Sequence, residues 1–396
     1  MRDPRNIGRF GSVKIALVHK RLDLNGGTER DLFRTAEGLR DLGHDVHLFC
    51  GEYGVSPPAG ISPHRVPLVP LGRTLRLWSF AFFVPGHLRR ASCDVVVNFG
   101  RLLSQDVLRS GGGSHRAFLD KLGQTGGAWR RLWQRTSLYH QSLLAMEKRQ
   151  FERGHYQQIL AVSGEVKREL TTTYAVPENR ITVIYNGVDH QRFHPGLRQQ
   201  FRESVRKQWK IPFGAPTVLF VGSGFLRKGL DRLLAVWDSP KLQDSYLLVV
   251  GEDAKRERYR ALAERQARGR VVFTGRQAEV ERYYGAADLV ALPAVQEAFG
   301  NVVLEALASG LPVVVSKSVG AAEVLKAELR SGIVARPEDP REMEEKLVAM
   351  LERSRDPNFR MGARQLGEEY SWKNHFLKLQ TLLQEVVERR HCESCC

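Results

Sequence analysis

The chain has 396 residues, of which 42% are hydrophobic and 26% are charged, and its formal net charge is +16. This length suits two domains, each with its own core, better than a single domain. The longest apolar stretch, Leu77 to Pro85, is less than half as long as a membrane-spanning helix must be, so we expect no transmembrane segment.

The two chain ends give little sign of targeting or crosslinking. The N-terminus passes straight into an apolar strand pattern, without the separate apolar core and cleavage site of a signal peptide, so we expect a cytoplasmic protein. Five cysteines are too few and too unevenly placed for a disulfide framework. Cys392, Cys395 and Cys396 form a short tail over residues 391–396, which could be a disordered segment with reactive thiols, take a metal or become acylated.

The positive charge is concentrated in the first half. Arg65 to Arg135 contains 12 basic and 3 acidic residues, which predicts an anionic partner. Aromatic residues accompany these arginines: Trp78, Phe80, Phe82, Phe83, Trp129 and Trp133. Rings beside guanidinium groups suit an acidic membrane surface, to which the protein would attach peripherally. A solvated basic face and nucleic acid are the alternatives, but no zinc-finger, basic-zipper or RNP-like pattern supports a specific nucleic-acid role.

The first half alternates apolar strands with helical patterns, which is typical of a doubly wound parallel sheet. Strands are predicted at residues 13–18, 46–49, 94–98, 158–162 and 181–184, and helices at residues 32–42 and 165–174. The pair Gly26-Gly27 follows the first strand and opens a helix, where small residues let backbone amides approach a phosphate.

A second doubly wound unit follows. Strands are predicted at residues 217–221, 246–250, 271–273, 289–292 and 313–315, after a charged helix near residues 199–209. The predicted organisation is an N-terminal domain over 1–198, a C-terminal domain over 199–371, and a helix over 372–390 that returns to the first domain. Residues 190–216 are interpreted as the interdomain segment about which the domains close.

Two clusters in the second half carry chemistry. Arg227 and Lys228 follow a glycine turn after a strand and suit a diphosphate, since arginine can bond two oxygens and lysine supplies a point charge. Glu297 falls in the loop after residues 289–292, and Glu305 lies in the helix that follows. Free amides at the start of that helix, beside a loop carboxylate, can hold sugar hydroxyls.

These motifs resemble the retaining nucleotide-sugar glycosyltransferases of the GT-B fold, which have two Rossmann-like domains facing across a cleft. The matching pieces are Gly26-Gly27-Thr28-Glu29-Arg30-Asp31, Gly111-Gly112-Gly113-Ser114-His115-Arg116, the run from Gly222 to Arg232, and the run from Gln296 to Ala306. From Val13 to about Val387 the chain is similar to the lipopolysaccharide core glucosyltransferase I family.

The resemblance implies roles for individual residues. On the donor side, Arg227 and Lys228 would bind the diphosphate of a UDP-sugar, Glu305 the ribose, and Glu297 with the amides of Phe299, Gly300 and Asn301 the transferred sugar. Arg192 would be a further donor-side cation. Gly26 and Gly27 would close on the phosphates, and Asp31 and His115 would lie near the reacting end; His115 could equally order the glycine loop.

The function implied is transfer of a hexose, most simply glucose from UDP-glucose, onto a heptose of the lipopolysaccharide inner core, with retention of configuration. No Asp-x-Asp motif occurs among the 16 aspartates, so we expect no metal and no cofactor beyond the donor. Another UDP-sugar or an exopolysaccharide lipid acceptor is the nearest alternative. A noncatalytic lipid- or nucleic-acid-binding protein on the same fold is a second one, and the missing G-x-G-x-x-G pattern disfavours a nicotinamide dehydrogenase.

Overall fold

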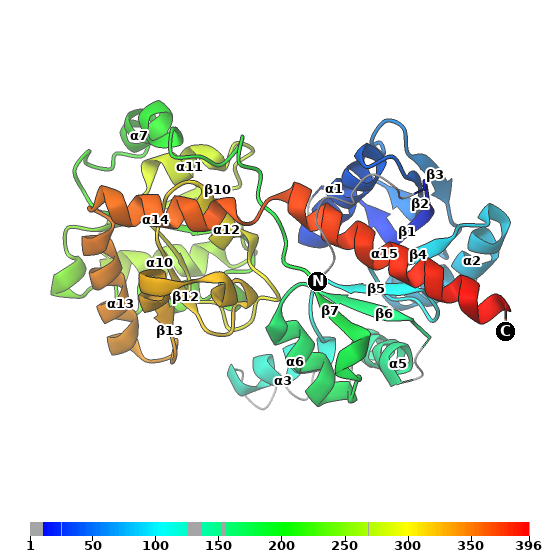
Figure 1. Ribbon diagram of the computed structural model, residues 1–396. Coiled ribbons are helices and arrows are strands. Elements are labelled where there is room, and N and C mark those ends of the chain that lie inside the picture. The colour runs from blue at the N-terminus through cyan, green and yellow to red at the C-terminus, as the bar shows by residue number, and fades with distance from the viewer. Residues whose placement is uncertain (1–10, 25, 126–136, 153–154, 268, 396) are drawn as a thin grey trace. The chain divides into compact units, whose positions relative to one another are not determined.

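The computed structural model describes residues 11–24, 26–125, 137–152, 155–267 and 269–395. They form two compact α/β units (Figure 1). Unit 1 takes in the described residues of Met1–Val162, Val166–Ile184 and His375–Cys396, and unit 2 those of Ser163–Glu165 and Tyr185–Asn374.

Unit 1 is built on a seven-stranded parallel sheet with the order β3-β2-β1-β4-β5-β6-β7. Its strands are β1 (Lys14–Leu22), β2 (Asp45–Tyr53), β3 (Ser62–Arg65), β4 (Val95–Asn98), β5 (Val107–Ser110), β6 (Gln158–Ala161) and β7 (Ile181–Val183). Its helices are α1 (Gly27–Asp41), α2 (Gly72–Ala91), α3 (His115–Thr125), α5 (Leu138–Glu152), α6 (Gly164–Tyr174) and α15 (Trp372–Cys395).

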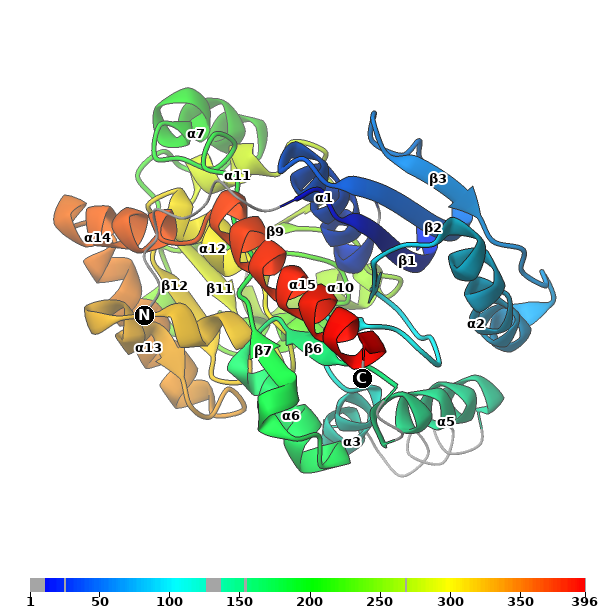
Figure 2. The same cartoon turned by 45° about the vertical axis from the view of Figure 1, so that its right-hand side comes forward.

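The strand period of two divides the core of unit 1 into two layers. Ile15 and Leu17 of β1 point to the face covered by α1 and α15, while Ala16 and Val18 point to the face covered by α2 and α5. The helix α15, red in Figure 2, contributes Leu379, Leu382, Leu383 and Val386 to the first layer. The chain therefore returns at its end to complete the core of unit 1.

Unit 2 has a six-stranded parallel sheet with the order β10-β9-β8-β11-β12-β13. The strands are β8 (Thr217–Val221), β9 (Tyr246–Val250), β10 (Val271–Gly275), β11 (Leu289–Leu292), β12 (Val313–Ser316) and β13 (Ile333–Val334). The α-helices are α7 (Leu197–Gln208), α8 (Phe225–Lys228), α9 (Leu230–Leu234), α10 (Arg256–Ala267), α11 (Glu281–Ala286), α12 (Asn301–Ala308), α13 (Pro340–Arg353) and α14 (Pro357–Glu368).

The doubly wound α/β architecture predicted for both halves is confirmed, whereas several bounds differ. The strands β3, β5 and β13 were not predicted. β13 has only two residues, whereas polar residues interrupt the apolar pattern of β3 and β5, and β3 includes a proline at the edge of its sheet. The last helix runs through Cys395, further than the predicted end at residue 390, so the cysteine tail is largely helical, and Cys396 lies outside the described residues.

The boundary between the units also differs from the one predicted after residue 198. The chain enters unit 2 at Tyr185 and leaves it after Asn374. Residues 190–216 therefore belong to unit 2 rather than to an interdomain segment. The reason is packing: Arg192 binds Glu281 of α11, and the Phe193 ring packs edge-on against Tyr284 of the same helix.

No helix among the described residues is long and apolar enough to cross a membrane. The aromatic residues of the basic region differ in exposure, and Trp78 packs partly buried against the core. Phe80 is buried and belongs to the core, because it lies on the face of α2 that packs on the sheet. Phe82 is 77% exposed and Phe83 is 39% exposed on the opposite face. Trp129 and Trp133, with Arg130, Arg131 and Arg135, lie outside the described residues.

Candidate active site

The predicted donor residues follow two neighbouring strands of unit 2. The chain winds outward from β8 to β9 and β10, and then crosses to β11 on the other side of β8. Such a reversal of strand order opens a crevice outside the carboxyl ends of the strands, where ligands of doubly wound folds bind. Arg227 and Lys228 follow β8, and Glu297 follows β11. The topology therefore brings all three to the same edge of the sheet.

Glu297 contacts both cations. Its Oε2 lies 2.5 Å from Arg227 Nη1 and 3.3 Å from Lys228 Nζ. The Lys228 side chain folds back over Gly222, where an added Cβ would lie 2.5 Å from Lys228 Cε. The backbone of Glu297 is fixed as well, since its carbonyl accepts a hydrogen bond from Gly320 N at 3.0 Å. The carboxylate is therefore held against two positive charges by a rigid loop.

The protonation state of Glu297 follows from this pairing. Burial acts to raise its pKa, but Lys228 and then Arg227 outweigh burial and hold the pKa below its ordinary value. Glu297 is thus a carboxylate at neutral pH. With two cations and one carboxylate, the cluster has one positive charge in excess and is suited to an anionic ligand.

The helix α12 begins beside this cluster. Gly300 precedes it with φ of 94°, a conformation that residues with a side chain rarely adopt. No side-chain hydrogen bond caps this position, so amides of the first turn are available to a ligand. The Phe299 side chain is 3% exposed and Asn301 accepts a hydrogen bond from Asn186 at 2.8 Å. Both residues are fixed, and Phe299 can offer a ligand its backbone but not its ring.

Glu305 lies one turn into α12 and has a hydrogen-bond partner, Tyr284, that was not predicted from the sequence. The hydroxyl of Tyr284, on α11, donates to Glu305 Oε2 at 2.5 Å. Burial, followed by the Glu305 charge, raises the pKa of Tyr284 well above its ordinary value, which keeps the phenol protonated as a donor. One oxygen of Glu305 is oriented in this way.

Arg192 also meets α11. Its Nη2 lies 2.7 Å from Glu281 Oε2 and its Nε lies 2.9 Å from the same oxygen. Because Glu281 and Tyr284 occupy successive positions on one face of α11, this short helix holds both Arg192 and Glu305. Nothing in the local sequence pattern distinguishes Glu281 and Tyr284 from ordinary helix residues, which explains why they were not predicted.

In unit 1 the predicted glycine turn forms the start of α1. Gly26 is extended and precedes the helix, and a Cβ on it would collide with the Glu29 carboxylate. Glu29 Oε1 lies 3.6 Å from His19 Nε2, and the hydrogen bond with His19 is the main cause of its lowered pKa. The acidic side chain of Glu29 thus lies over the first turn of α1, where a negative charge is favoured.

Asp31 is buried against Arg109 of β5, with 2.9 Å between Asp31 Oδ2 and Arg109 Nη2. The two residues are 7% and 3% exposed. The ion pair joins α1 to the middle of the sheet. Arg109 was not predicted because β5, which carries it, was not predicted. The ion pair shows that the Asp31 carboxylate is buried and fixed rather than solvated.

His115 lies at the first position of α3 within a buried polar network. Its backbone amide donates to Glu147 Oε1 at 2.8 Å, and its Nε2 lies 3.0 Å from His140 Nδ1. Burial lowers the pKa of His115 to about 4, although Glu147 acts in the opposite direction. Glu147 is itself fully buried and also binds Arg101 and Tyr174. His115 is therefore neutral at neutral pH and held at the glycine loop.

Two family models match the chain, one in each half. The model described as Glycosyltransferase Family 4 matches residues 25–192, and the model described as Glycosyl transferases group 1 matches residues 215–353. Together with the two parallel sheets and the polar cluster at the switch point of unit 2, these matches define the class. The chain is a GT-B glycosyltransferase of the family 4 type.

Among its relatives is the lipopolysaccharide glucosyltransferase WaaG of Escherichia coli (strain K12), which is 28% identical over 333 residues, 83% of this chain and 87% of that protein. A crystal structure of WaaG covers 93% of this chain and 99% of its own, with a TM-score of 0.78 and 25% identity. Anabaena Alr3699/HepE, solved with UDP-glucose, shares the fold with a TM-score of 0.69, 17% identity, and coverage of 94% and 100%.

Proposed function

We propose that the protein transfers glucose from UDP-glucose to a heptose of the lipopolysaccharide inner core, with retention of anomeric configuration. The observation that carries the proposal is the cluster of Arg227, Lys228 and Glu297 at the switch point of unit 2, beside the start of α12. The similarity to WaaG supports the choice of donor and acceptor.

The donor diphosphate would take the place that Glu297 now holds on the two cations. Arg227 and Lys228 would then bind phosphate oxygens, with Arg227 bonding two of them. The released Glu297 carboxylate would accept hydrogen bonds from sugar hydroxyls, aided by the amides of Phe299, Gly300 and Asn301. This exchange couples arrival of the diphosphate to the availability of the group that binds the sugar.

The same cations would stabilise the departing UDP. Negative charge develops on the β-phosphate as the glycosidic bond breaks, and fixed positive groups aimed at that charge lower the barrier. We propose that Arg227, Lys228 and the α12 amides serve this role without a divalent metal or other cofactor. Glu305, with one oxygen fixed by Tyr284, would bind the ribose hydroxyls.

Unit 1 would supply the acceptor side. Gly26, Gly27, Asp31 and His115 remain its proposed contributions. Since His115 is neutral, its role would be to position a hydroxyl through a hydrogen bond rather than to supply charge. Asp31, paired with Arg109, would likewise act as a fixed hydrogen-bond acceptor.

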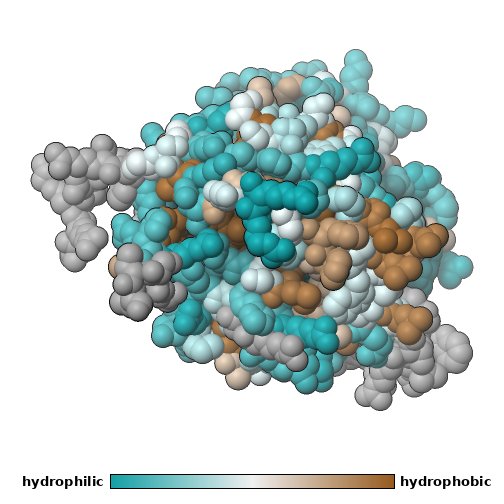
Figure 3. Space-filling view, turned by 90° about the vertical axis from the view of Figure 1, so that its right-hand side faces the viewer, coloured by the Kyte–Doolittle hydropathy of each residue, from teal (hydrophilic) through white to brown (hydrophobic). Residues whose placement is uncertain are grey.

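We further propose that unit 1 attaches the enzyme to the cytoplasmic face of the inner membrane through the outer face of α2. Leu75 and Phe82 lie seven residues apart on that face, and Arg89 follows one further heptad on; all three are exposed. Figure 3 shows this side of the molecule, and the larger hydrophobic areas, in brown, lie toward the right of the view. Apolar side chains beside arginines suit the headgroup layer of an anionic membrane.

The direct test is UDP release by the purified protein with a panel of UDP-sugars, with and without heptose-terminated core, in excess chelator. Release that requires both UDP-glucose and the acceptor, and that persists in chelator, is expected. Release from another donor, or without dependence on this acceptor, would reassign the substrates within the same class. Absence of release from every donor would overturn the proposal in favour of a binding role.

A further inference from the structure

A second polar cluster of unit 2 lies at the opposite end of the strands from the donor residues. Asp288 immediately precedes β11, whereas Glu297 follows that strand. In a parallel sheet the amino ends of all strands share one edge and the carboxyl ends share the other. Pro216, before β8, and Gly310, before β12, line the same region as Asp288. This cluster is therefore separate from the donor cluster.

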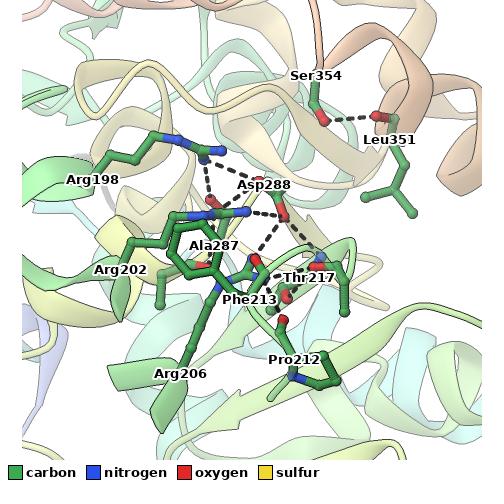
Figure 4. A network of polar contacts seen from close by, with 12 residues as sticks. Arg198, Arg202, Arg206, Pro212, Phe213, Thr217, Ala287, Asp288, Leu351 and Ser354 are labelled. Carbon is green, nitrogen blue, oxygen red and sulfur yellow. Dashed lines mark hydrogen bonds and ion pairs between the residues drawn. The ribbon is translucent and has the colours of Figure 1, made fainter. Parts of the chain in front are cut away.

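Three arginines of α7 converge on Asp288. Arg198, Arg202 and Arg206 lie four residues apart, on one face of the helix, and each is within 3.0 Å of a carboxylate oxygen of Asp288 (Figure 4). Arg206 also donates to the carbonyls of Ala286, Pro212, Phe213 and Ala215, so its role is structural. One carboxylate therefore faces three guanidinium groups, which leaves two positive charges in excess.

Arg198, Arg202 and Asp288 line a pocket of about 660 Å³, which we call the arginine pocket. Its basic lining residues are Arg198, Arg202, Arg355, Arg360 and Arg364, and its apolar lining residues include Pro195, Pro216, Leu351, Pro357 and Met361. The volume lies in the range of small-molecule sites, and a mostly apolar wall with a few fixed polar groups is their usual composition.

The charges of the arginine pocket do not balance. Asp288 is the sole carboxylate in its lining. Arg364 pairs with Glu368 just outside, but among the described residues no carboxylate forms an ion pair with Arg355 or Arg360. Arg360 is half-buried, and its Nη1 is buried without a hydrogen-bond partner in the described part of the chain. A buried guanidinium nitrogen without a hydrogen-bond partner destabilises the folded state, and an anion bound there would supply the missing acceptor.

Repulsion within the cluster is evident at Arg360. Burial and then the positive charge of Arg198 lower its pKa to about 10. Every cation in the lining is an arginine, and a planar guanidinium can bond two oxygens of a phosphate at once. The arrangement thus suits a tetrahedral anion with several oxygens better than a single carboxylate.

We propose that the arginine pocket binds a phosphorylated small molecule, with its phosphate on Arg355, Arg360 and the outer side of Arg198 and its apolar part against the proline and methionine walls. This site is additional to the donor site and does not depend on the proposed transfer. Inorganic pyrophosphate is a suitable probe because it supplies the charged group alone.

The test is calorimetric titration of pyrophosphate into the full chain in the presence of excess UDP, which is intended to fill the donor site. The double variant Arg355→Gln, Arg360→Gln should bind pyrophosphate at least about tenfold more weakly, since charge-assisted hydrogen bonds are lost. Arg330→Gln, an exposed position outside the pocket, is the matched control and should bind like the wild type. Arg206 is left intact so that the fold is kept.

Equal binding by the double variant and the control, or no binding by the wild type, would overturn the proposal. If UDP itself fails to bind, the proposed donor is wrong. The dependence of pyrophosphate binding on Arg355 and Arg360 can still be measured in that case. Competition distinguishes two sources of the phosphate. Displacement by glucose 1-phosphate would assign it to a free metabolite, and displacement by phosphatidylglycerol but not phosphatidylcholine vesicles would assign it to a lipid headgroup.

Discussion

Glu297 contacts both Arg227 and Lys228, so replacing it should affect UDP binding and turnover in different ways. In Glu297→Gln the two cations lose a competing carboxylate, so UDP should bind as tightly as in the wild type or more tightly. Turnover should fall about a hundredfold, because the group proposed to hold the sugar in the transition state is lost. Calorimetry with UDP and steady-state kinetics would measure the two effects.

The matched control is Glu328→Gln, which removes a carboxylate from an exposed ion pair with Arg353 that does not involve the donor cluster. It should change neither quantity. Unchanged turnover in Glu297→Gln would contradict the role assigned to this residue, and weaker UDP binding would show that Glu297 does not compete with the diphosphate.

The lowered pKa of His115 predicts how the stability of the protein depends on pH. Its pKa in the folded protein, about 4, is below the ordinary value of 6.5. The unfolded chain therefore takes up a proton first as the pH falls, so the stability contributed by neutral His115 is complete above about pH 6.5 and is lost progressively toward pH 4. The melting temperature of His115→Gln should fall less than that of the wild type between pH 7 and pH 5.

His391→Gln, which alters an exposed histidine near the end of α15, should keep the wild-type pH dependence. If His115→Gln loses as much melting temperature as the wild type on acidification, burial of His115 is not the source of the pH dependence. His140 contacts His115 and has a pKa lowered in the same direction by burial, so part of the dependence should persist in the variant.

The individual residues differ in how far the sequence predicted them. Arg227, Lys228 and Glu297 were predicted as one donor site and do contact one another, because each follows a strong strand pattern and the parallel topology places strand ends together. Tyr284, Glu281 and Glu147 were not predicted. Each contacts a partner that is distant in sequence. A buried glutamate such as Glu147 cannot be distinguished by sequence from a glutamate on the surface of a helix.

At the scale of elements, one face of α7 carries both a buried structural arginine and a partly exposed one. Arg206 is buried against Asp288 and four carbonyl groups. Arg206→Ala should lower the free energy of unfolding by about 3–5 kcal/mol, because the five hydrogen bonds of its buried guanidinium are lost. Arg198→Ala should cost about 0–1 kcal/mol, because Arg198 is partly exposed and Asp288 keeps two other partners.

Urea unfolding of both variants would measure these differences. Similar small losses in both would contradict the structural role of Arg206, and a similar large loss in Arg198→Ala would show that the three arginines act as one unit.

Predictability also varied among elements. Buried strands such as β8, β9 and β11 were predicted with their observed ends, because continuous apolar runs bounded by turns leave few alternatives. The strands β3 and β5 were missed because histidine, arginine and proline interrupt the apolar pattern. The missed β5 carries Arg109, so a missed element also meant a missed site residue.

At the scale of the whole molecule, the exposed face of α2 predicts membrane attachment. Phe82→Ser with Phe83→Ser should weaken binding to phosphatidylglycerol vesicles by about tenfold or more, since two aromatic side chains no longer enter the interface. Vesicle sedimentation would measure this change. Phe213→Ser, which removes an exposed phenylalanine of unit 2, is the control and should bind normally; an equal loss in that control would contradict docking through α2.

The central proposal is the transfer of glucose from UDP-glucose to the lipopolysaccharide core by this GT-B enzyme, which is related to WaaG. The most direct measurement is mass spectrometry of heptose-terminated lipopolysaccharide core after incubation with the protein and UDP-glucose. One added hexose per core molecule, absent when Glu297→Gln replaces the wild type, is the predicted result. An unmodified core, with UDP-glucose left intact, would contradict the claim.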